Sequence, residues 1–138
     1  MNRLPGIVCE VDAFGSIALV GVQVGAQRCT ATLVGVVGDL GDWPAGLPVT
    51  LLFKETEVAL GKNLSGLISM RNRLPAIVTA IERGRLLTSV TLDADGHVLG
   101  AIITSGSAER LGLGVGDQVE ALIKANEMNL LRSGGEGG

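Results

Sequence analysis

The second half of the chain alternates between apolar and polar residues in short runs, which is typical of strands that bury one face. Turn signals separate the runs, and Asp93-Ala94-Asp95-Gly96 is the clearest, because Asp-Gly supplies the positive φ of a tight hairpin. The predicted strands span 76–81, 86–92, 97–104, 118–124 and 127–131. Residues 105–113 instead predict one helical turn, with Ser107 as its N-cap and Gly112 at its end. Five short strands with one helical turn before the fourth predict an all-β, OB-like barrel.

The same pattern occurs earlier in the chain at a constant offset. Asn2-Arg3-Leu4-Pro5 recurs as Asn72-Arg73-Leu74-Pro75, an offset of 70 residues (72 − 2). Other identities at this offset are Val20/Val90, Ala31/Ala101, Gly46/Gly116, Lys54/Lys124 and Glu57/Glu127. Because no gap is needed, we expect two tandem five-stranded barrels, each with at most one short helical turn. Their predicted bounds are 1–62 and 63–131, followed by a disordered tail over 132–138.

The first copy differs from the second between its third and fourth strands. Its early strands are predicted over 20–25 and 30–37. A segment rich in Gly, Pro and Asp, 38–48, then replaces the helical turn. Trp43 lies in this segment and is predicted to cover the end of the barrel, since tryptophan is usually buried.

Composition narrows the classes of function. The chain has 138 residues, a net charge of −3 and only 2% aromatic residues, whereas binders of nucleic acid are usually basic and stack bases on aromatic rings. Its apolar runs are shorter than the roughly 18 residues of a membrane span, and no signal peptide is apparent at the start. We therefore expect a cytoplasmic protein that binds neither nucleic acid nor membrane. Its small aliphatic barrels favour association between copies.

The sequence offers little for catalysis or metal binding. Cys9 and Cys29 lack metal spacing, and one histidine does not complete a zinc set. They are expected to be reduced core thiols, although a disulfide between neighbouring strands is the alternative. His97 starts a strand after a hairpin, and Asp93 and Asp95 are turn residues. No phosphate-binding loop is present, so we do not expect an enzyme, a bound metal ion or a covalent cofactor.

The second copy does carry the groups that bind a small oxyanion. Hydroxyl, amide and cationic side chains precede its first strand, end its third strand, begin its helical turn and end its fourth strand. These residues are Ser69, Met70, Arg71, Asn72, Thr104, Ser107, Ala108 and Lys124. A tetrahedral oxyanion needs several donors and one or two cations. Each residue also has a purely structural explanation, as a cap, a strand former or a charge on an edge strand.

The first copy serves as an internal control for these explanations. At the 70-residue offset, Thr104 becomes Val34, Ser107 becomes Val37 and Arg71 becomes Met1. Asn2 and Lys54 keep the polar character of Asn72 and Lys124. The hydroxyls are lost while the apolar pattern stays, which favours a binding role in the second copy. Lys54 marks a second candidate site in the first.

Three segments of the second copy resemble the molybdate-binding Mop (molbindin) domain of the TOBE type. They are Ser69-Met70-Arg71-Asn72, the run from Ile103 to Ala108, and Leu122-Ile123-Lys124-Ala125. The family's opening motif is Ser-Ala-Arg-Asn, so Met70 is a departure, and a Lys-Ala pair lies in its late strand. The tandem arrangement is similar to storage molbindins, to the effector half of molybdate-responsive regulators and to the tail of the molybdate transporter ATPase.

The resemblance implies non-catalytic binding of molybdate or tungstate for molybdenum homeostasis, at sites shared between domains or between the subunits of a dimer or trimer. It implies that Ser69 to Asn72 meet the oxyanion on one side. Thr104, Ser107, Ala108 and Lys124 would come from the facing barrel. The alternative is a sensing module that belongs to a transcription regulator or a transporter ATPase.

Overall fold

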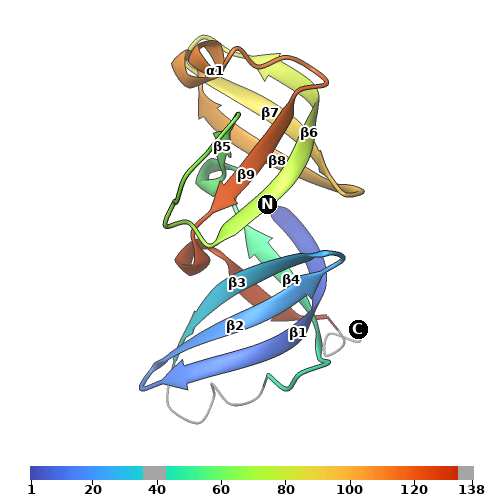
Figure 1. Ribbon diagram of the computed structural model, residues 1–138, viewed down its shortest axis with the longest axis vertical. Coiled ribbons are helices and arrows are strands. Elements are labelled where there is room, and N and C mark those ends of the chain that lie inside the picture. The colour runs from blue at the N-terminus through green and yellow to red at the C-terminus, as the bar shows by residue number, and fades with distance from the viewer. Residues whose placement is uncertain (36–42, 134–138) are drawn as a thin grey trace. The chain divides into compact units, whose positions relative to one another are not determined.

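Two antiparallel five-stranded sheets, each curled into a half-barrel, account for most of residues 1–35 and 43–133, the residues that the computed structural model describes (Figure 1). One sheet has the order β10-β4-β1-β2-β3 and the other the order β5-β9-β6-β7-β8. The first consists of β1 (Asn2–Phe14), β2 (Ile17–Val24), β3 (Gln27–Val34), β4 (Pro48–Phe53) and β10 (Asn129–Arg132). The second consists of β5 (Ala59–Gly61), β6 (Asn72–Arg83), β7 (Leu87–Ala94), β8 (His97–Thr104) and β9 (Gln118–Ile123). The predicted all-β fold of two OB-like barrels is confirmed.

Helical structure is short in both halves. The helix α1 (Ser105–Leu111) follows β8, and the 3-10 turns η1 (Glu55–Glu57) and η2 (Ala125–Glu127) follow β4 and β9. Among the described residues, no helix has both the length and the apolar character that crossing a bilayer requires.

Each sheet takes one strand from the other copy of the repeat. The strand β5 of the first copy pairs with β9, and β10 of the second copy pairs with β4. Packing therefore divides the chain into two interleaved units. Unit 1 holds residues 1–2 and 54–123, and unit 2 holds residues 3–53 together with the chain from Lys124 onward. The bounds 1–62 and 63–131 stay a prediction about the repeat, which the packing units do not follow.

The core of each unit is mainly aliphatic, as the composition predicts. In unit 1, alternate residues of β7 and β8 point inward, and Val90, Leu92 and Leu99 are almost completely buried. In unit 2, Val20, Val22, Leu51 and Phe53 are fully buried. Because the side-chain period of a strand is two, Ser89, Thr91 and Asp93 alternate with the buried residues of β7 and face outward.

The predicted hairpin at residues 93–96 is confirmed, with both central residues at positive φ: 52° at Asp95 and 91° at Gly96. The N-cap of α1 was predicted one turn too late. It is Thr104, whose extended backbone (φ −67°, ψ 146°) leaves its hydroxyl free to accept from the Ser107 N–H. Gly112 ends the helix in the left-handed region, at φ 59°, as predicted.

Other bounds shift by a few residues. The strand β6 is longer than predicted at both ends, since it begins at Asn72, where it pairs with β9, and continues past a bulge between Val78 and Ala80 to Arg83. The predicted last strand begins late, because residues 125–127 form η2. The predicted disordered tail is wrong at its start, since Arg132 ends β10 and the Ser133 N–H donates to the Pro48 carbonyl. Residues 134–138, and 36–42 of the first copy, lie outside the described residues.

Trp43 is half-buried, and the Arg132 guanidinium lies 4.9 Å from the centroid of its ring. This cation–π contact lies within unit 2. The contact gives Trp43 a structural role, and its predicted place over the end of the barrel stays a prediction.

The two cysteines are free thiols, as predicted. Cys29 of β3 faces Val22, and Cys9 occupies a bulge of β1 that faces Val22 and Gly21. The strand β2 therefore separates them, and two strand spacings of about 4.8 Å exceed the reach of a disulfide. The alternative of a disulfide is excluded.

Burial raises the pKa of the Cys29 thiol to about 11, which lowers its thiolate fraction at pH 8 about a hundredfold. We expect one thiol, Cys9, to react with Ellman's reagent in the native protein, and two in denaturant. Cys9→Ser should abolish the native reaction. Because a raised pKa favours the protonated thiol in the folded state, stability from Cys29 should fall as pH rises from 9 towards 11. Two rapidly reacting native thiols would contradict this.

Candidate functional site

The first group of predicted donors lies at the start of β6. Ser69 and Arg71 are exposed, Met70 is half-buried, and Asn72, the first residue of the strand, is completely buried. In the β6–β9 ladder Asn72 faces Ile123. Lys124 follows Ile123 directly, is exposed, and is the N-cap of η2. The register therefore places Lys124 one residue beyond the partner of Asn72.

Arg73, the next residue of β6, is held by a carboxylate. Its Nε and Nη2 donate to the two oxygens of Glu120 on β9, both at 2.8 Å. The Arg73 guanidinium holds the pKa of Glu120 below its usual range, so the pair stays ionised at neutral pH. Arg73 thus aligns the start of β6, and Arg71 is the arginine that faces solvent. Sequence reasoning did not identify this ion pair, although opposite charges on neighbouring strands are its signal.

The second group of donors surrounds the start of α1. The Ser107 N–H donates to the Thr104 hydroxyl at 3.1 Å, and that hydroxyl donates to Ser107 Oγ at 2.8 Å. Arg110 Nη2 also approaches Ser107 Oγ, at 3.4 Å. Ser107 Oγ thus accepts twice and keeps its own proton for another acceptor. The side chain of Ala108 is 1% exposed and packs in the core, so only its backbone is suited to a ligand.

Ser105 attaches the start of α1 to the β6–β7 hairpin. Its Oγ donates to the Gly84 carbonyl at 2.7 Å and lies 2.9 Å from Thr88 Oγ1. Its N–H donates to the Leu86 carbonyl at 2.8 Å. Ser105 was not among the predicted site residues, and these contacts give it a structural role.

The strand order separates the two groups of donors. Leu87, at the start of β7, faces Thr104, at the end of β8, so Thr104 lies beside the β6–β7 hairpin. Asn72 lies at the opposite end of β6, which has 12 residues and a path of about 35 Å. Within unit 1, the Ser69–Asn72 group and the Thr104–Ala108 group therefore lie at opposite ends of the sheet.

Lys54 has different surroundings from Lys124. It is the exposed N-cap of η1, and its N–H donates to Glu57 Oε1 at 3.0 Å. The next residue is Glu55, whose carboxylate lies 2.7 Å from the Met1 amino group, whereas Ala125 follows Lys124. A resident carboxylate beside Lys54 disfavours a second anion there.

Asn2, the counterpart of Asn72, has a structural role in unit 1. Its amide donates to the Gly100 carbonyl at 2.9 Å and accepts from the Gly100 N–H at 2.7 Å. Asn2 is 5% exposed, so these bonds satisfy backbone groups at a partly buried point of β8. The asparagine that occurs at this position in both copies therefore has a structural role in the first copy, as Asn2.

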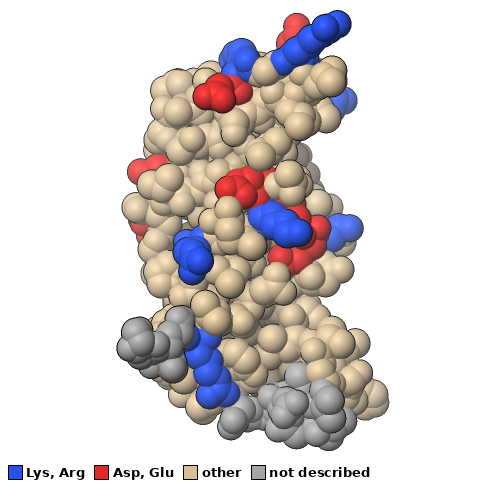
Figure 2. Space-filling view, turned by 180° about the vertical axis from the view of Figure 1, so that it is seen from behind, with Lys and Arg blue, Asp and Glu red and all other residues tan. Residues whose placement is uncertain are grey.

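Charge is distributed in small groups over the surface. On the face shown in Figure 2, Lys and Arg side chains stand among acidic and uncharged residues and form no continuous basic area. Among residues 1–35 and 43–133, no three His, Cys, Asp or Glu side chains are placed to hold a metal ion. The arrangement is suited to a small anion that a few local donors recognise.

Comparisons with known proteins agree with this arrangement. Residues 68–130 match the TOBE domain family. A crystal structure of the cytoplasmic molybdate-binding protein ModG, with molybdate bound, superposes with a TM-score of 0.87 at 28% identity and covers 94% of each chain. The molybdenum import ATP-binding protein ModC of Brucella abortus is 46% identical over 78 residues, which are 56% of this chain and 22% of ModC.

A further relative is the molybdenum-pterin-binding protein MopA of Rhodobacter capsulatus, which is 44% identical over 71 residues, 51% of this chain and 26% of MopA. The chain thus spans about a quarter of the length of these two curated relatives. The domain match covers the second copy, and the structural match extends the likeness across both barrels. The chain therefore contains a TOBE domain over residues 68–130 and shares the two-barrel fold of ModG.

Proposed function

We propose that the protein binds molybdate or tungstate in the cytoplasm without catalysing a reaction, as a store or buffer of molybdenum. The observation that carries the proposal is the set of hydroxyls, together with Arg71, that the second copy has and the first copy lacks. Thr104 and Ser107 stand where the first copy has Val34 and Val37. The likeness to ModG, which was crystallised with molybdate, supports the same ligand.

We infer that a complete site takes its donors from two copies of the chain. One chain would supply Ser69 to Asn72 together with Lys124, since the β6–β9 register groups them. The second chain of the oligomer would supply the Ser107 hydroxyl and the backbone at Ala108. The 12-residue length of β6 supports this division, because a single unit 1 holds the two groups at opposite ends. A homo-oligomer, dimer or trimer, follows from it.

The proposed site binds through hydrogen bonds and charge alone. Arg71 and Lys124 supply two exposed cations for a doubly negative oxyanion. Each charge-assisted hydrogen bond contributes about 1.5–3 kcal/mol. Asn72 is completely buried, which suits support of the strand start better than direct contact with the anion.

A sensing or transport module is the second candidate. The 46% identity to ModC covers only 22% of that protein, so the chain resembles a part of a larger transporter subunit. An ATPase or DNA-binding segment in the same reading frame would favour this candidate. The oxyanion site would be the same in both cases.

Isothermal titration calorimetry with molybdate, tungstate and sulfate tests the proposal. Heat is expected with the first two, and a shared site predicts that stoichiometry follows the oligomer measured by sedimentation. The test variant is Thr104→Val with Ser107→Val, which places in the second copy the residues that the first copy has at these positions. This variant should keep its β-sheet circular dichroism and lose binding. The absence of heat with both molybdate and tungstate would rule the function out.

A further inference from the structure

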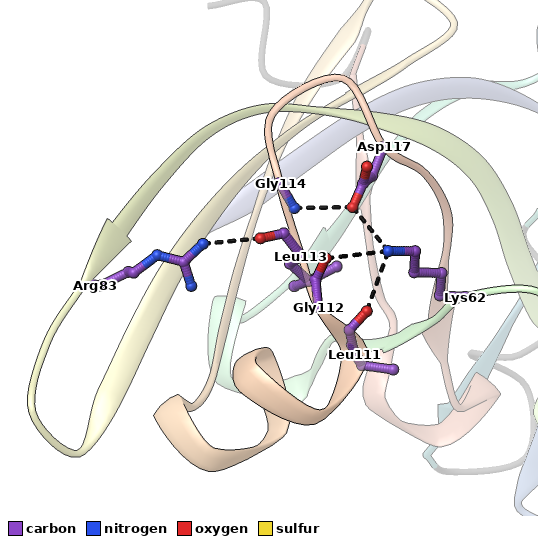
Figure 3. Close-up of polar contacts among 7 residues, drawn as sticks. All are labelled: Lys62, Arg83, Leu111, Gly112, Leu113, Gly114 and Asp117. Carbon is purple, nitrogen blue, oxygen red and sulfur yellow. Dashed lines mark hydrogen bonds and ion pairs between the residues drawn. The ribbon is translucent and has the colours of Figure 1, made fainter.

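The far end of α1 is held by a lysine from the linker between the two copies. Lys62 Nζ donates to the Leu111 carbonyl at 3.1 Å, to the Gly112 carbonyl at 3.1 Å and to Asp117 Oδ2 at 3.0 Å (Figure 3). Three acceptors use all three ammonium protons. The carbonyls at the end of a helix lack partners within the helix, so this cation satisfies them.

Asp117 connects this contact to the turn that follows the helix. Its Oδ2 also accepts from the Gly114 N–H at 2.8 Å. Lys62 and the Gly114 N–H together hold the pKa of Asp117 below its usual range, so the carboxylate is charged at neutral pH. Arg83 Nη2 donates to the Leu113 carbonyl at 2.8 Å, from the β6–β7 hairpin (Figure 3). We call Lys62 and Asp117, with the carbonyls of Leu111 and Gly112, the α1 clasp.

The clasp joins the two segments that carry the proposed oxyanion donors. Lys62 begins the linker that leads to Ser69 and Arg71, and it directly follows β5. The chain after Lys62 folds back at once, so that Leu64 packs against Gly61 and a methyl group added at Gly61 would collide with it. On the other side, α1 leads from the clasp back to Ser107. The clasp therefore connects the segment that leads to Ser69 with the helix that carries Ser107.

The first copy again serves as a control. At the 70-residue offset Lys62 corresponds to Arg132, which packs on Trp43 in unit 2. Asp117 corresponds to Leu47 and Arg83 to Ala13, so the first copy lacks the acceptor and the second donor. The cation at this position makes stabilising contacts in both units, Lys62 in unit 1 and Arg132 in unit 2. The carboxylate that makes it a clasp is present only with the hydroxyls of Thr104 and Ser107.

We propose, building on the proposed function, that Lys62 and Asp117 are positioning residues of the oxyanion site, which hold α1 so that Ser107 faces the bound anion. Neither residue contacts the anion. Their effect passes through α1, which buries only Ala108 and otherwise depends on polar contacts at its two ends.

The test is calorimetry with molybdate on the full-length chain carrying Lys62→Met, which removes the ammonium and keeps the apolar stem. Affinity should fall about tenfold, a coupling of ordinary size. Lys62→Arg should restore most of it, and Asp117→Asn should resemble Lys62→Met. The matched control is Arg132→Met, which removes the equivalent cation from unit 2. It should lower the thermal midpoint without changing the molybdate affinity.

Hydrogen exchange supplies a readout that stability alone does not move. The Gly114 N–H bonds to Asp117, so its exchange rate reports on the clasp. Coupling is reciprocal, so saturating molybdate should slow this exchange in the original protein and not in Lys62→Met. If the original protein binds molybdate and Lys62→Met binds equally well, the positioning role is wrong and the proposed function stands. If the original protein does not bind molybdate, the proposed function itself fails.

Discussion

Replacement of Asn2 by alanine is expected to lower the free energy of unfolding by about 2 kcal/mol. The Asn2 amide pairs with both the N–H and the carbonyl of Gly100, at 2.7 and 2.9 Å, and its side chain is almost fully buried. Alanine leaves both backbone groups of Gly100 without these bonds at a partly buried point of β8. Urea denaturation followed by circular dichroism measures the change.

Two further variants define the cause. Asn2→Asp keeps an acceptor for the Gly100 N–H but turns an oxygen towards the Gly100 carbonyl, so its loss should be at least as large. Gln23→Ala removes one exposed bond to the Gly25 carbonyl and should cost less than about 0.5 kcal/mol. Equal losses for Asn2→Ala and Gln23→Ala would mean that the amide does not support β8. The structural interpretation of Asn72, its counterpart, would then lose its basis.

Much of the fold could be predicted because the signals are local and occur twice. Alternating runs and the Asp95-Gly96 turn determine β7 and β8 by short-range geometry, and β8 spans its predicted residues, 97–104. The 70-residue repeat adds independent support, since Asn2 and Asn72 both begin long strands. The bulge that lengthens β6 leaves no clear sequence signal, so that bound was missed.

The exchange of strands between the copies was beyond sequence reasoning. The strands β5 and β10 have the same pattern whether they pair within their own copy or with the other. Only the packing decides between the two possible pairings, because an alternation with period two identifies the buried face of a strand and not the strand with which it pairs. The interleaved units are therefore a property of the three-dimensional structure.

The sequence predicted which residues could form an oxyanion site, whereas the contacts among these residues required the structure. Comparison of the copies selected Thr104 and Ser107 as site residues, which stays a prediction, and the structure adds that they bond to each other and that the helix begins one turn earlier than expected. Lys124 was expected opposite Ser69 to Asn72, on the facing barrel. Within one chain, the β6–β9 register places Lys124 one residue beyond the partner of Asn72, which supports the proposed grouping of Lys124 with Ser69 to Asn72. Lys62 was not identified as a functional residue because its three partners are distant in sequence.

Replacement of Lys124 by alanine is expected to weaken molybdate binding by about 2 kcal/mol, roughly thirtyfold. Lys124 is exposed and directly follows Ile123, the residue that faces Asn72, so its ammonium is available to a bound anion. The N-cap role of Lys124 uses no side-chain hydrogen bond, so the change should leave η2 and the fold intact. Calorimetry with molybdate on the purified variant, with circular dichroism as a check of folding, measures the loss.

The matched control is Lys54→Ala, at the equivalent position of the first copy. Lys54 also caps a 3-10 turn without a side-chain hydrogen bond from its ammonium, but Glu55 follows it where Ala125 follows Lys124. The Glu55 carboxylate disfavours an anion beside Lys54, so this change should alter neither affinity nor stoichiometry. A loss of half the bound molybdate on Lys54→Ala would instead identify Lys54 as part of a second site. Equal affinity in Lys124→Ala and the original protein would remove Lys124 from the site altogether.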